Sequence, residues 1–470
     1  MSSCRMPYDD VAWAESEEAF DRWKGKLFDE DVLRAIAALI HQHRGGGIPT
    51  ELCAPTRGSF NACVRLKFLD GGSAIMRIPC PGLVMFPEEK TRDEVAVMRF
   101  IEHHTSIPVP HVLHYGMTDD CPHRLGPFII MEYIEHAHDL VDALNMPGLG
   151  WQDRPILDPQ IPNERLELVY SQMADILLQL AKCPFSRIGS VREEENDDDD
   201  TWTVTERPLT MNMNDLVCLA KFPRSELPST TFETSRDYYR ALADTHLQHL
   251  STQRNDAVES ASDCRRKYVA RHLFRQLAAQ GRLGNERSAP EPSRLFCDDL
   301  RPANVLVNAD FQIVAVVDWE FTYVAPADFT YSPPWWLLLE LPEYWPRGLS
   351  DWEATYVPRL ETFLHLLEKQ ERLALETKAL REPLQLASRM RHSWETGAFW
   401  VSYAARKSWA FDSIFWRSID ERFFGQHQGL EERLALLQEN EQRNIDDFVL
   451  RKLAEGRGEG GKATTTTTTP

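Results

Sequence analysis

Two short segments decide the fold: LFCDDLRPANVLV at residues 295–307 and VVDWE at residues 316–320. The runs 305–307 and 313–317 are rich in β-branched residues, and a polar turn at 308–310 separates them. This pattern predicts a β-hairpin. Polar residues stand directly before the first strand and directly after the second. The chemistry of the chain is therefore expected to concentrate in this one segment.

Asp299, Asn304 and Asp318 are the polar residues around this hairpin. Transfer of a phosphoryl group needs a carboxylate that orients and deprotonates the acceptor hydroxyl, and metal ions that neutralise the phosphates. Magnesium prefers oxygen ligands and usually takes one or two carboxylates from a protein. An Asp, an Asn five positions later and an Asp after the next strand supply this set, and Pro302 rigidifies the loop. The alternative is a polar turn that joins two buried strands.

A second sheet is predicted upstream. Residues 64–68 alternate between apolar and basic side chains, the turn 70–72 follows, and the run 74–78 completes a hairpin. Residues 87–102 carry apolar positions at helical spacing, and the wholly apolar run 128–131 is typical of a buried strand. The order is thus hairpin, helix and strand. Helical patterns dominate the chain after that, apart from the segment quoted above.

Composition narrows the classes of protein. The 470 residues carry a net charge of −20, with 43% apolar and 26% charged residues, which is typical of a soluble globular protein. No apolar run approaches the roughly 18 to 20 residues of a membrane span, and the acidic start at residues 1–20 argues against a secretion signal. The negative charge disfavours nucleic-acid and anionic-membrane partners. The same charge would help a cationic substrate to approach. The alternative is that it only keeps the protein soluble.

The cysteines point to the compartment. Nine cysteines are scattered along the chain without a Cys-x-x-Cys pair, so a metal cluster or a disulfide framework is not expected. Reduced thiols in the cytoplasm fit this pattern better. We therefore expect a cytoplasmic protein. We also expect it to be a monomer or a weak dimer.

The segment 295–320 resembles the catalytic loop and the metal-binding Asp of the aminoglycoside phosphotransferase family, which includes choline-kinase-like and other small-molecule kinases with the protein-kinase fold. The loop of that family reads His-Gly-Asp-x-x-x-x-Asn, and a strand that ends in Asp-Trp or Asp-Phe follows it. The resemblance implies that Asp299 is the catalytic base, Asn304 a magnesium ligand and Asp318 the principal magnesium ligand. It implies ATP and Mg²⁺ as cofactors and a small-molecule hydroxyl as the acceptor of the γ-phosphate.

The resemblance extends over residues 56–331. The family places a glycine loop over the phosphates, a Lys on the next strand, a Glu on the following helix and an adenine-binding hinge. Arg77 stands where the Lys is expected and keeps its charge with a different reach, and Glu94 matches its partner. The alternatives are a plain turn in place of the loop and two surface residues in place of the pair. The nucleotide-binding residues that the resemblance implies are Gly58, Ser59, Phe60, Asn61, Arg77, Glu94, Met131, Glu132 and Ile134, with backbone groups of Glu132 and Ile134 binding adenine.

Two positions depart from the family pattern. Cys297 stands where the family has His, and a thiol is only a weak hydrogen-bond donor. We expect it to support the loop as a buried residue, since no His stands beside it to activate a nucleophile. Asp298 stands where the family has Gly. Its carboxylate either raises a pKa in the site by like-charge repulsion, or points away from Asp299.

The acceptor stays open. Aromatic faces with acidic neighbours would suit a cationic or sugar-like acceptor, whereas the same residues would serve equally as packing in the helical lobe. The aromatic residues that follow Asp318 are Trp335, Trp336, Tyr344, Trp345, Trp394, Trp400, Trp409 and Trp416.

Three functional hypotheses remain at this point. The first is an ATP-dependent small-molecule kinase. The second is a catalytically impaired nucleotide-binding or scaffold protein of the same fold, suggested by Cys297, Arg77 and the single glycine of the loop. The third is a protein kinase, and the absence of an Ala-Pro-Glu segment after Asp318 argues against it. The intact set of Asp299, Asn304 and Asp318 favours the first.

The expected architecture is an α+β, bilobal protein-kinase-like fold with a small antiparallel β-sheet N-lobe and a larger, mostly helical C-lobe. We expect a helical N-terminal extension at residues 1–50, the N-lobe at 51–134 and the C-lobe at 135–455. An acidic insert near 193–200 should be a solvated surface loop or a disordered insert. The threonine-rich tail at 456–470 should be disordered.

Overall fold

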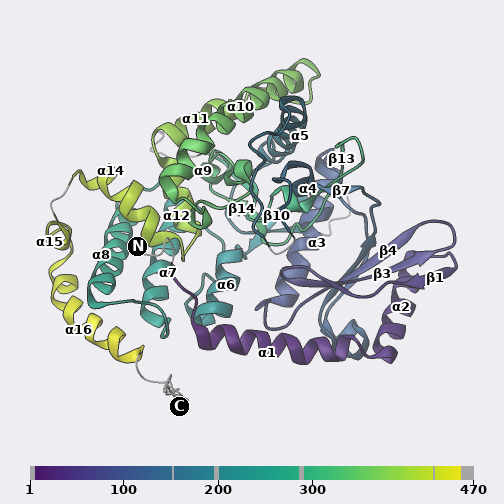
Figure 1. The fold of residues 1–470 in the computed structure, drawn as a ribbon, viewed down its shortest axis with the longest axis horizontal. Helices are drawn as coiled ribbons and strands as arrows, with labels where there is room; N and C mark the ends of the chain where they lie inside the picture. Colours follow the sequence, from purple (N-terminus) through teal and green to yellow (C-terminus); the bar gives the residue numbers. More distant parts are fainter. Residues whose placement is uncertain (1–5, 151–152, 195–200, 285–290, 427–428, 457–470) are drawn as a thin grey trace, which may run out of the picture.

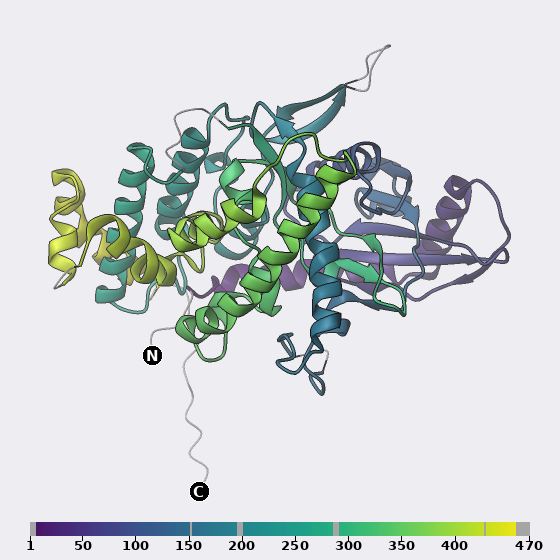
Figure 2. The same cartoon turned by 90° about the horizontal axis from the view of Figure 1, so that it is seen from above.

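A computed structural model describes residues 6–150, 153–194, 201–284, 291–426 and 429–456. Figure 1 shows a small lobe built around a sheet, next to a larger lobe made mostly of helices. In the view from above, the sheet again lies at one end of the molecule (Figure 2). The predicted α+β fold, with a small antiparallel sheet lobe and a larger helical lobe, is confirmed.

The small lobe holds a six-stranded sheet with the order β1-β3-β4-β6-β5, in which β2 also pairs with β3. All its strand pairs are antiparallel. Alternate residues of β3, such as Val64, Leu66 and Phe68, enter the core because successive side chains of a strand point to opposite faces. The strands are β1 (Pro49–Leu52), β2 (Thr56–Arg57), β3 (Asn61–Phe68), β4 (Ser73–Pro79), β5 (Val112–Gly116) and β6 (Phe128–Glu132).

The helix α3 (Pro87–His104) packs against this sheet. Pro87 occupies the first helical position, where a missing N–H leaves no hydrogen bond unmade. Most of the buried residues of α3 are apolar, but Lys90 and Glu94 are buried as well, one turn apart on the helix. Because buried charges need partners, these two side chains mark a polar site next to the sheet.

The N-terminal segment contacts both lobes. It forms α1 (Asp10–Leu27) and α2 (Glu30–Arg44), whose apolar residues join the core of the small-lobe sheet. Ahead of α1, Met6 is buried in the large lobe, and its N–H donates to the carbonyl of Trp409 at 2.8 Å. Figure 1 shows α1 along the lower edge of the molecule, running from the large lobe to the small one.

Two three-stranded sheets of the large lobe hold the segment that the sequence singled out, with the orders β13-β12-β7 and β14-β11-β8. The expected hairpin is confirmed as β12 and β13. The loop after β11 and the loop after β13 each lead from one of these sheets to the other, so the two loops lie next to each other. The strands are β7 (His138–Asp139), β8 (Pro184–Phe185), β11 (Ser293–Cys297), β12 (Val305–Val307), β13 (Ile313–Val316) and β14 (Thr322–Ala325).

Helices and one hairpin make up the rest of the large lobe. α5 packs along α10, and both views show the two helices together (Figure 2). The hairpin consists of β9 (Ser190–Glu194) and β10 (Thr201–Glu206). The helices are α4 (Leu140–Leu144), α5 (Asn163–Ala181), α6 (Met211–Ala220), α7 (Ser235–Thr252), α8 (Ala261–Ala279), α9 (Ala327–Thr330), α10 (Leu349–Glu376), α11 (Leu386–Glu395), α12 (Ala398–Arg406), α13 (Phe411–Ile414), α14 (Asp420–Phe424), α15 (Leu430–Leu434) and α16 (Glu439–Glu455).

Two sequence expectations fall largely outside the described residues. The first two residues of the acidic insert, Glu193 and Glu194, end β9, whereas 195–200 and the tail 457–470 are not among the described residues. Within the described ranges, no helix has both the length and the apolar content to cross a membrane. The cysteines of those ranges are free thiols.

Side chains of the large lobe form ion pairs with α3. Asp93 accepts hydrogen bonds from Ser190 Oγ at 2.7 Å and from Arg192 Nη2 at 2.5 Å. Glu89 accepts two bonds from Arg207, both at 2.7 Å. Burial raises the pKa of Asp93 to about 6, and the neighbouring Arg192 opposes the rise only in part. The position of α3 relative to the large lobe is thus fixed by charged pairs.

Replacement of Gly82 by alanine should weaken the contact between α1 and the small lobe. Gly82 has a φ of +86°, and a Cβ there would lie 2.3 Å from the carbonyl oxygen of Ser16 on α1. Gly71 is the matched control, because its φ is +87° and its Cβ would meet nothing within 4 Å. We expect Gly82→Ala to lower the free energy of unfolding in urea by about 1 to 3 kcal/mol more than Gly71→Ala. Equal losses would contradict this contact.

Asp93 should make stability depend on pH. Its pKa is about 6 in the folded chain, against 3.8 for an ordinary Asp, so the folded state holds the proton more tightly. The stability that this proton contributes is complete below about pH 4 and is lost as the pH rises through about 6. The difference in unfolding free energy between the wild type and Asp93→Asn should therefore fall between pH 4 and pH 7. A difference that rises or stays level over this range would show the pKa shift to be wrong.

Candidate active site

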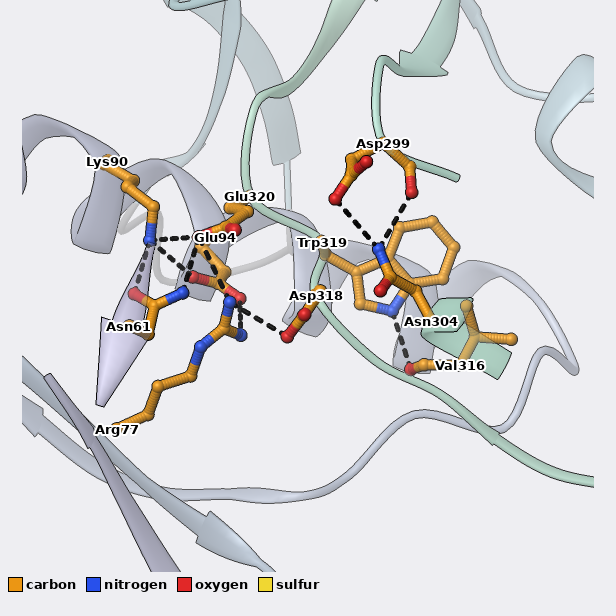
Figure 3. A network of polar contacts seen from close by, with 10 residues as sticks. All are labelled: Asn61, Arg77, Lys90, Glu94, Asp299, Asn304, Val316, Asp318, Trp319 and Glu320. Atoms are coloured by element: carbon orange, nitrogen blue, oxygen red, sulfur yellow. Dashed lines mark hydrogen bonds and ion pairs between the residues drawn. The ribbon is translucent and has the colours of Figure 1, made fainter. Parts of the chain in front are cut away.

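The loop between β11 and β12 is closed by Asn304. A short 3₁₀ turn, Pro302–Asn304, precedes β12, and Asn304 Nδ2 donates to both the backbone carbonyl of Asp299 at 2.8 Å and its Oδ2 at 3.0 Å. The spacing of five residues seen in the sequence thus corresponds to a direct contact (Figure 3). Both residues are largely buried.

Asp299 is held on both of its carboxylate oxygens. Arg301 Nε donates to Oδ1 at 2.8 Å, and Asn304 donates to Oδ2. Burial raises the pKa of Asp299 above its ordinary value, while Arg301 and Asn304 act in the opposite direction. The carboxylate is therefore fixed in orientation and is a stronger base than an exposed Asp, which suits a group that accepts a proton from a hydroxyl.

Asp318 stands on the loop after β13, directly beside the first loop. The Val317 N–H donates to the Asn304 carbonyl at 2.8 Å and joins the two loops. Asp318 has a φ of +60°, a conformation that residues other than glycine rarely adopt. Such backbone strain persists where the surroundings over-determine it and is frequent at functional sites. The Asp318 side chain remains 38% exposed, whereas Glu320 is almost fully buried two residues later.

The predicted pair of Arg77 and Glu94 comes together. Arg77 Nη1 on β4 lies 2.5 Å from Glu94 Oε1 on α3. The same guanidinium reaches Asp318 Oδ1 at 2.9 Å and Glu320 Oε2 at 3.1 Å, so it joins the sheet, the helix and the second loop (Figure 3). The alternative of two surface residues is wrong, because both side chains are nearly inaccessible to solvent.

Lys90 and Glu320 are parts of this site that the sequence reasoning missed. The Lys90 ammonium contacts Glu320, lies 3.7 Å from Glu94 Oε2 and donates to Asn61 Oδ1 at 2.9 Å. Asn61 Nδ2 in turn donates to Glu320 Oε2 at 2.9 Å. Lys90 lies four residues before Glu94, so the sequence places both side chains on one face of the helix. The positions between them are polar or charged, and nothing in the sequence marked this face as buried.

The single-glycine loop forms a tight turn between β2 and β3. The Gly58 N–H donates to the Asn61 carbonyl at 2.9 Å, with Ser59 between them. Phe60 packs edge-on against Phe321, with ring centroids 5.3 Å apart. The turn is therefore anchored at its end by the aromatic contact and by the buried side chain of Asn61, rather than by further glycines.

The expected hinge follows β6. Met131 is buried, and the Glu132 N–H is already bonded to the His111 carbonyl at 3.0 Å. The Ile134 carbonyl accepts from His136 Nδ1 at 2.8 Å. Among the described residues, no hydrogen bond engages the Ile134 N–H. The Ile134 N–H is thus a backbone group of this segment that could bind a ligand.

The two residues that depart from the family pattern are both buried. Cys297 is buried at the end of β11, and burial raises the pKa of its thiol. A thiol of this kind is not a nucleophile at neutral pH. Asp298 is directed at Arg406 of α12, with 3.2 Å between Oδ1 and Nη1, and both side chains are buried. Of the two possibilities for Asp298, the structure shows a carboxylate engaged with a cation outside the loop.

The aromatic residues after Asp318 mainly pack the helical lobe. Trp336, Trp345, Trp400 and Trp409 are each less than 10% exposed. The remaining four, namely Trp335, Tyr344, Trp394 and Trp416, are partly buried. This distribution favours core packing over an open aromatic binding surface.

The oxygen ligands of the two loops fit a magnesium ion. Asn304 uses its Nδ2 for Asp299, which leaves its Oδ1 for another contact, and the Asp318 carboxylate is partly exposed. Across the described part of the chain, no three His, Cys, Asp or Glu side chains gather as a metal cluster. Magnesium does not need one, since it keeps several waters and takes one or two carboxylates.

Two paired loops next to a sheet, with a buried cation between the sheet and α3, are an arrangement that suits phosphoryl transfer. The sequence profile described as "Phosphotransferase enzyme family" matches residues 57–356, which is more than half of the chain. The chain therefore belongs to this family of phosphotransferases. The resemblance to aminoglycoside phosphotransferases is confirmed.

Several solved structures resemble the chain at low sequence identity. A macrolide 2'-phosphotransferase type I is 12% identical with a TM-score of 0.41, covering 83% of this chain and 97% of its own. An aminoglycoside phosphotransferase in a ternary complex with AMP-PNP and hygromycin B is 14% identical with a TM-score of 0.40, covering 90% and 99%. An ethanolamine kinase from Plasmodium vivax is 9% identical with a TM-score of 0.38, covering 95% and 97%. No curated protein matches the chain in sequence.

The pair of Asp298 and Arg406 should be important for stability. Arg406→Met would leave a buried carboxylate without its cation, and such a loss costs about 3 to 5 kcal/mol of unfolding free energy. The double variant with Asp298→Asn should recover part of this loss. Arg34→Met is the control, because Arg34 forms an exposed pair with Glu30 at 2.7 Å and should contribute about 1 kcal/mol or less. Urea unfolding measures all three, and equal effects of Arg406→Met and Arg34→Met would contradict the assignment.

Proposed function

We propose that the chain transfers the γ-phosphate of ATP to a hydroxyl group of a small molecule. One observation carries this proposal. The Asn304 side chain donates to Asp299, and the backbone carbonyl of Asn304 accepts from the Val317 N–H, directly before Asp318. A carboxylate suited to accept a proton and a carboxylate suited to bind a metal are thereby fixed on neighbouring loops. This is the minimal protein contribution that phosphoryl transfer needs.

Each group has a role in this proposal. Asp299 orients the acceptor hydroxyl and takes its proton as the bond to phosphorus forms. Asn304 and Asp318 hold magnesium, which neutralises phosphate charge when it is bound. Arg77 binds the phosphates, and Glu94 keeps its guanidinium in place. The remaining nucleotide contacts come from the turn Gly58–Asn61 and from backbone groups of the hinge near Met131, Glu132 and Ile134.

The setting of the reaction is part of the proposal. The free cysteines fit a reducing, cytoplasmic compartment. A net charge of −20 favours an acceptor that is neutral or cationic, such as a sugar-like or amine-bearing alcohol, and disfavours nucleic acid. We expect the chain to work as a monomer or a weak dimer.

A second candidate is a catalytically impaired nucleotide-binding or scaffold protein of the same fold. It is favoured by the surroundings of Arg77, whose guanidinium faces the three carboxylates of Glu94, Asp318 and Glu320. An arginine held this way would bind phosphate only if some of these contacts loosen. Nucleotide consumption separates the two candidates.

Two substitutions test the roles in the loops. Asp299→Asn should keep the affinity for Mg–ATP, because the carboxylate acts on the acceptor, but should lower the transfer rate by about 10²- to 10⁴-fold. Asp318→Asn should weaken magnesium-dependent ATP binding itself. Binding is measured by calorimetry with and without Mg²⁺, and transfer by ATP consumption in the presence of a library of hydroxyl-bearing metabolites. The matched control is Asp310→Asn, an exposed residue on the turn between β12 and β13.

The wild type decides between the proposals. If it binds no Mg–ATP at millimolar concentrations, the phosphotransferase proposal fails. If it binds Mg–ATP and no acceptor stimulates consumption, the impaired nucleotide-binding protein is the better description.

A further inference from the structure

The buried charges next to Asp318 include more cations than the proposed function uses. Five charged side chains meet here: the cations Arg77 and Lys90, and the carboxylates Glu94, Asp318 and Glu320 (Figure 3). Four of them are at most 6% exposed, and only Asp318 reaches solvent. Isolated charges at such depth are costly, so the two cations and the two buried carboxylates have to compensate each other.

The two cations differ in their contacts. Arg77 touches all three carboxylates, including the exposed Asp318. Lys90 touches only the two buried ones, Glu94 and Glu320, and donates to Asn61. The Lys90 ammonium is therefore surrounded by protein groups on its sides, whereas the Arg77 guanidinium borders the group that reaches solvent.

The Arg77 guanidinium has one well-bonded end and one unsatisfied end. Nη1 donates to Glu94 at 2.5 Å. Nη2 lies within ion-pair distance of Asp318 and Glu320, yet it is buried without a directed hydrogen bond. Buried N–H groups are normally bonded, whereas Nη2 is paired by charge without a directed hydrogen bond, so it can turn from the carboxylates to another acceptor, such as a phosphate oxygen.

If Nη2 turns toward phosphate while Nη1 stays on Glu94, Glu320 loses its contact with Arg77. Lys90 and Asn61 then remain as the partners of Glu320 among the side chains of the site. Without Lys90, the carboxylate would be buried with only an amide beside it. Glu320 would then keep Nη2 of Arg77 as its partner and away from phosphate, because an unpaired buried carboxylate is strongly unfavourable.

We propose that Lys90 is a positioning residue for nucleotide binding, the fixed counter-ion of Glu320 that frees Arg77 for the phosphates. Through Asn61, the same ammonium ties α3 to the end of the turn Gly58–Asn61, which is proposed to lie over the phosphates. This inference rests on the proposed function, because it assigns Arg77 to the phosphates of ATP. Lys90 itself does not touch the nucleotide.

The first test measures the affinity of folded variants for Mg–ATP by calorimetry. Lys90→Met should raise the dissociation constant by about tenfold or more, because Glu320 would then keep Nη2 of Arg77 and the contact between Arg77 and phosphate would be lost. Lys67→Met is the matched control, because Lys67 on β3 of the same lobe forms an exposed pair with Glu51 at 2.9 Å, and its affinity should equal that of the wild type. Urea unfolding of each variant shows that binding is measured on folded protein.

The second test distinguishes a counter-ion from a direct phosphate ligand. In the Glu320→Gln variant there is no carboxylate at position 320 for Lys90 to neutralise. Adding Lys90→Met to this variant should therefore change its affinity for Mg–ATP by less than about threefold, which is well under the tenfold effect expected in the wild type. If Lys90 bound phosphate directly, the double variant would be as weak as Lys90→Met alone. This comparison remains available even if Lys90→Met by itself does not fold, because the double variant keeps the buried charges balanced.

The outcomes separate the two proposals. A wild type that does not bind Mg–ATP overturns the proposed function and this inference together. A wild type that binds, with Lys90→Met equal to it in affinity, overturns the inference alone, whatever the loss in stability. Weak binding of Lys90→Met that Glu320→Gln does not restore also overturns it.

Discussion

The structure depends on one constraint: the charged side chains between the sheet of the small lobe and the loops of the large lobe have to neutralise each other. Glu320 is the centre of this arrangement, because it is contacted by Lys90 of α3, Arg77 of β4 and Asn61 of β3. A buried carboxylate with one missing partner is unfavourable by several kcal/mol. The sheet, the helix and the second loop are therefore held in one relative position.

Other contacts hold the same parts from outside. The hairpin of β9 and β10 contacts α3 through the ion pair between Arg192 and Asp93. The N-terminal segment adds a second connection, since Met6 is buried in the large lobe while α1 packs on the small one. Phosphoryl transfer depends on the relative placement of the reacting groups, so contacts that fix the lobes against each other would serve that placement.

The local chemistry of the loops was predictable, because neighbours in sequence decide it. Asn304 reaches Asp299 over five residues, and the hairpin of β12 and β13 follows from β-branched runs around a polar turn. The same reasoning did not find Lys90 or Glu320. In sequence each is an ordinary charged residue, and only its burial among other charges shows that it belongs to the site.

The sequence by itself determined the hairpins, the helix after the first of them and the residue types that suit phosphoryl transfer, because hydrophobic periodicity and short-range spacing encode them. The two-lobe arrangement was predicted from the resemblance of residues 295–320 to a known family. The tertiary structure alone decided which distant groups became partners. Asp298 binds Arg406, which lies more than a hundred residues away, and Asn61 binds Glu320 across the lobes. The N-terminal segment contacts both lobes. These choices depend on how elements pack, since buried charges accept whichever partner the packing brings within reach.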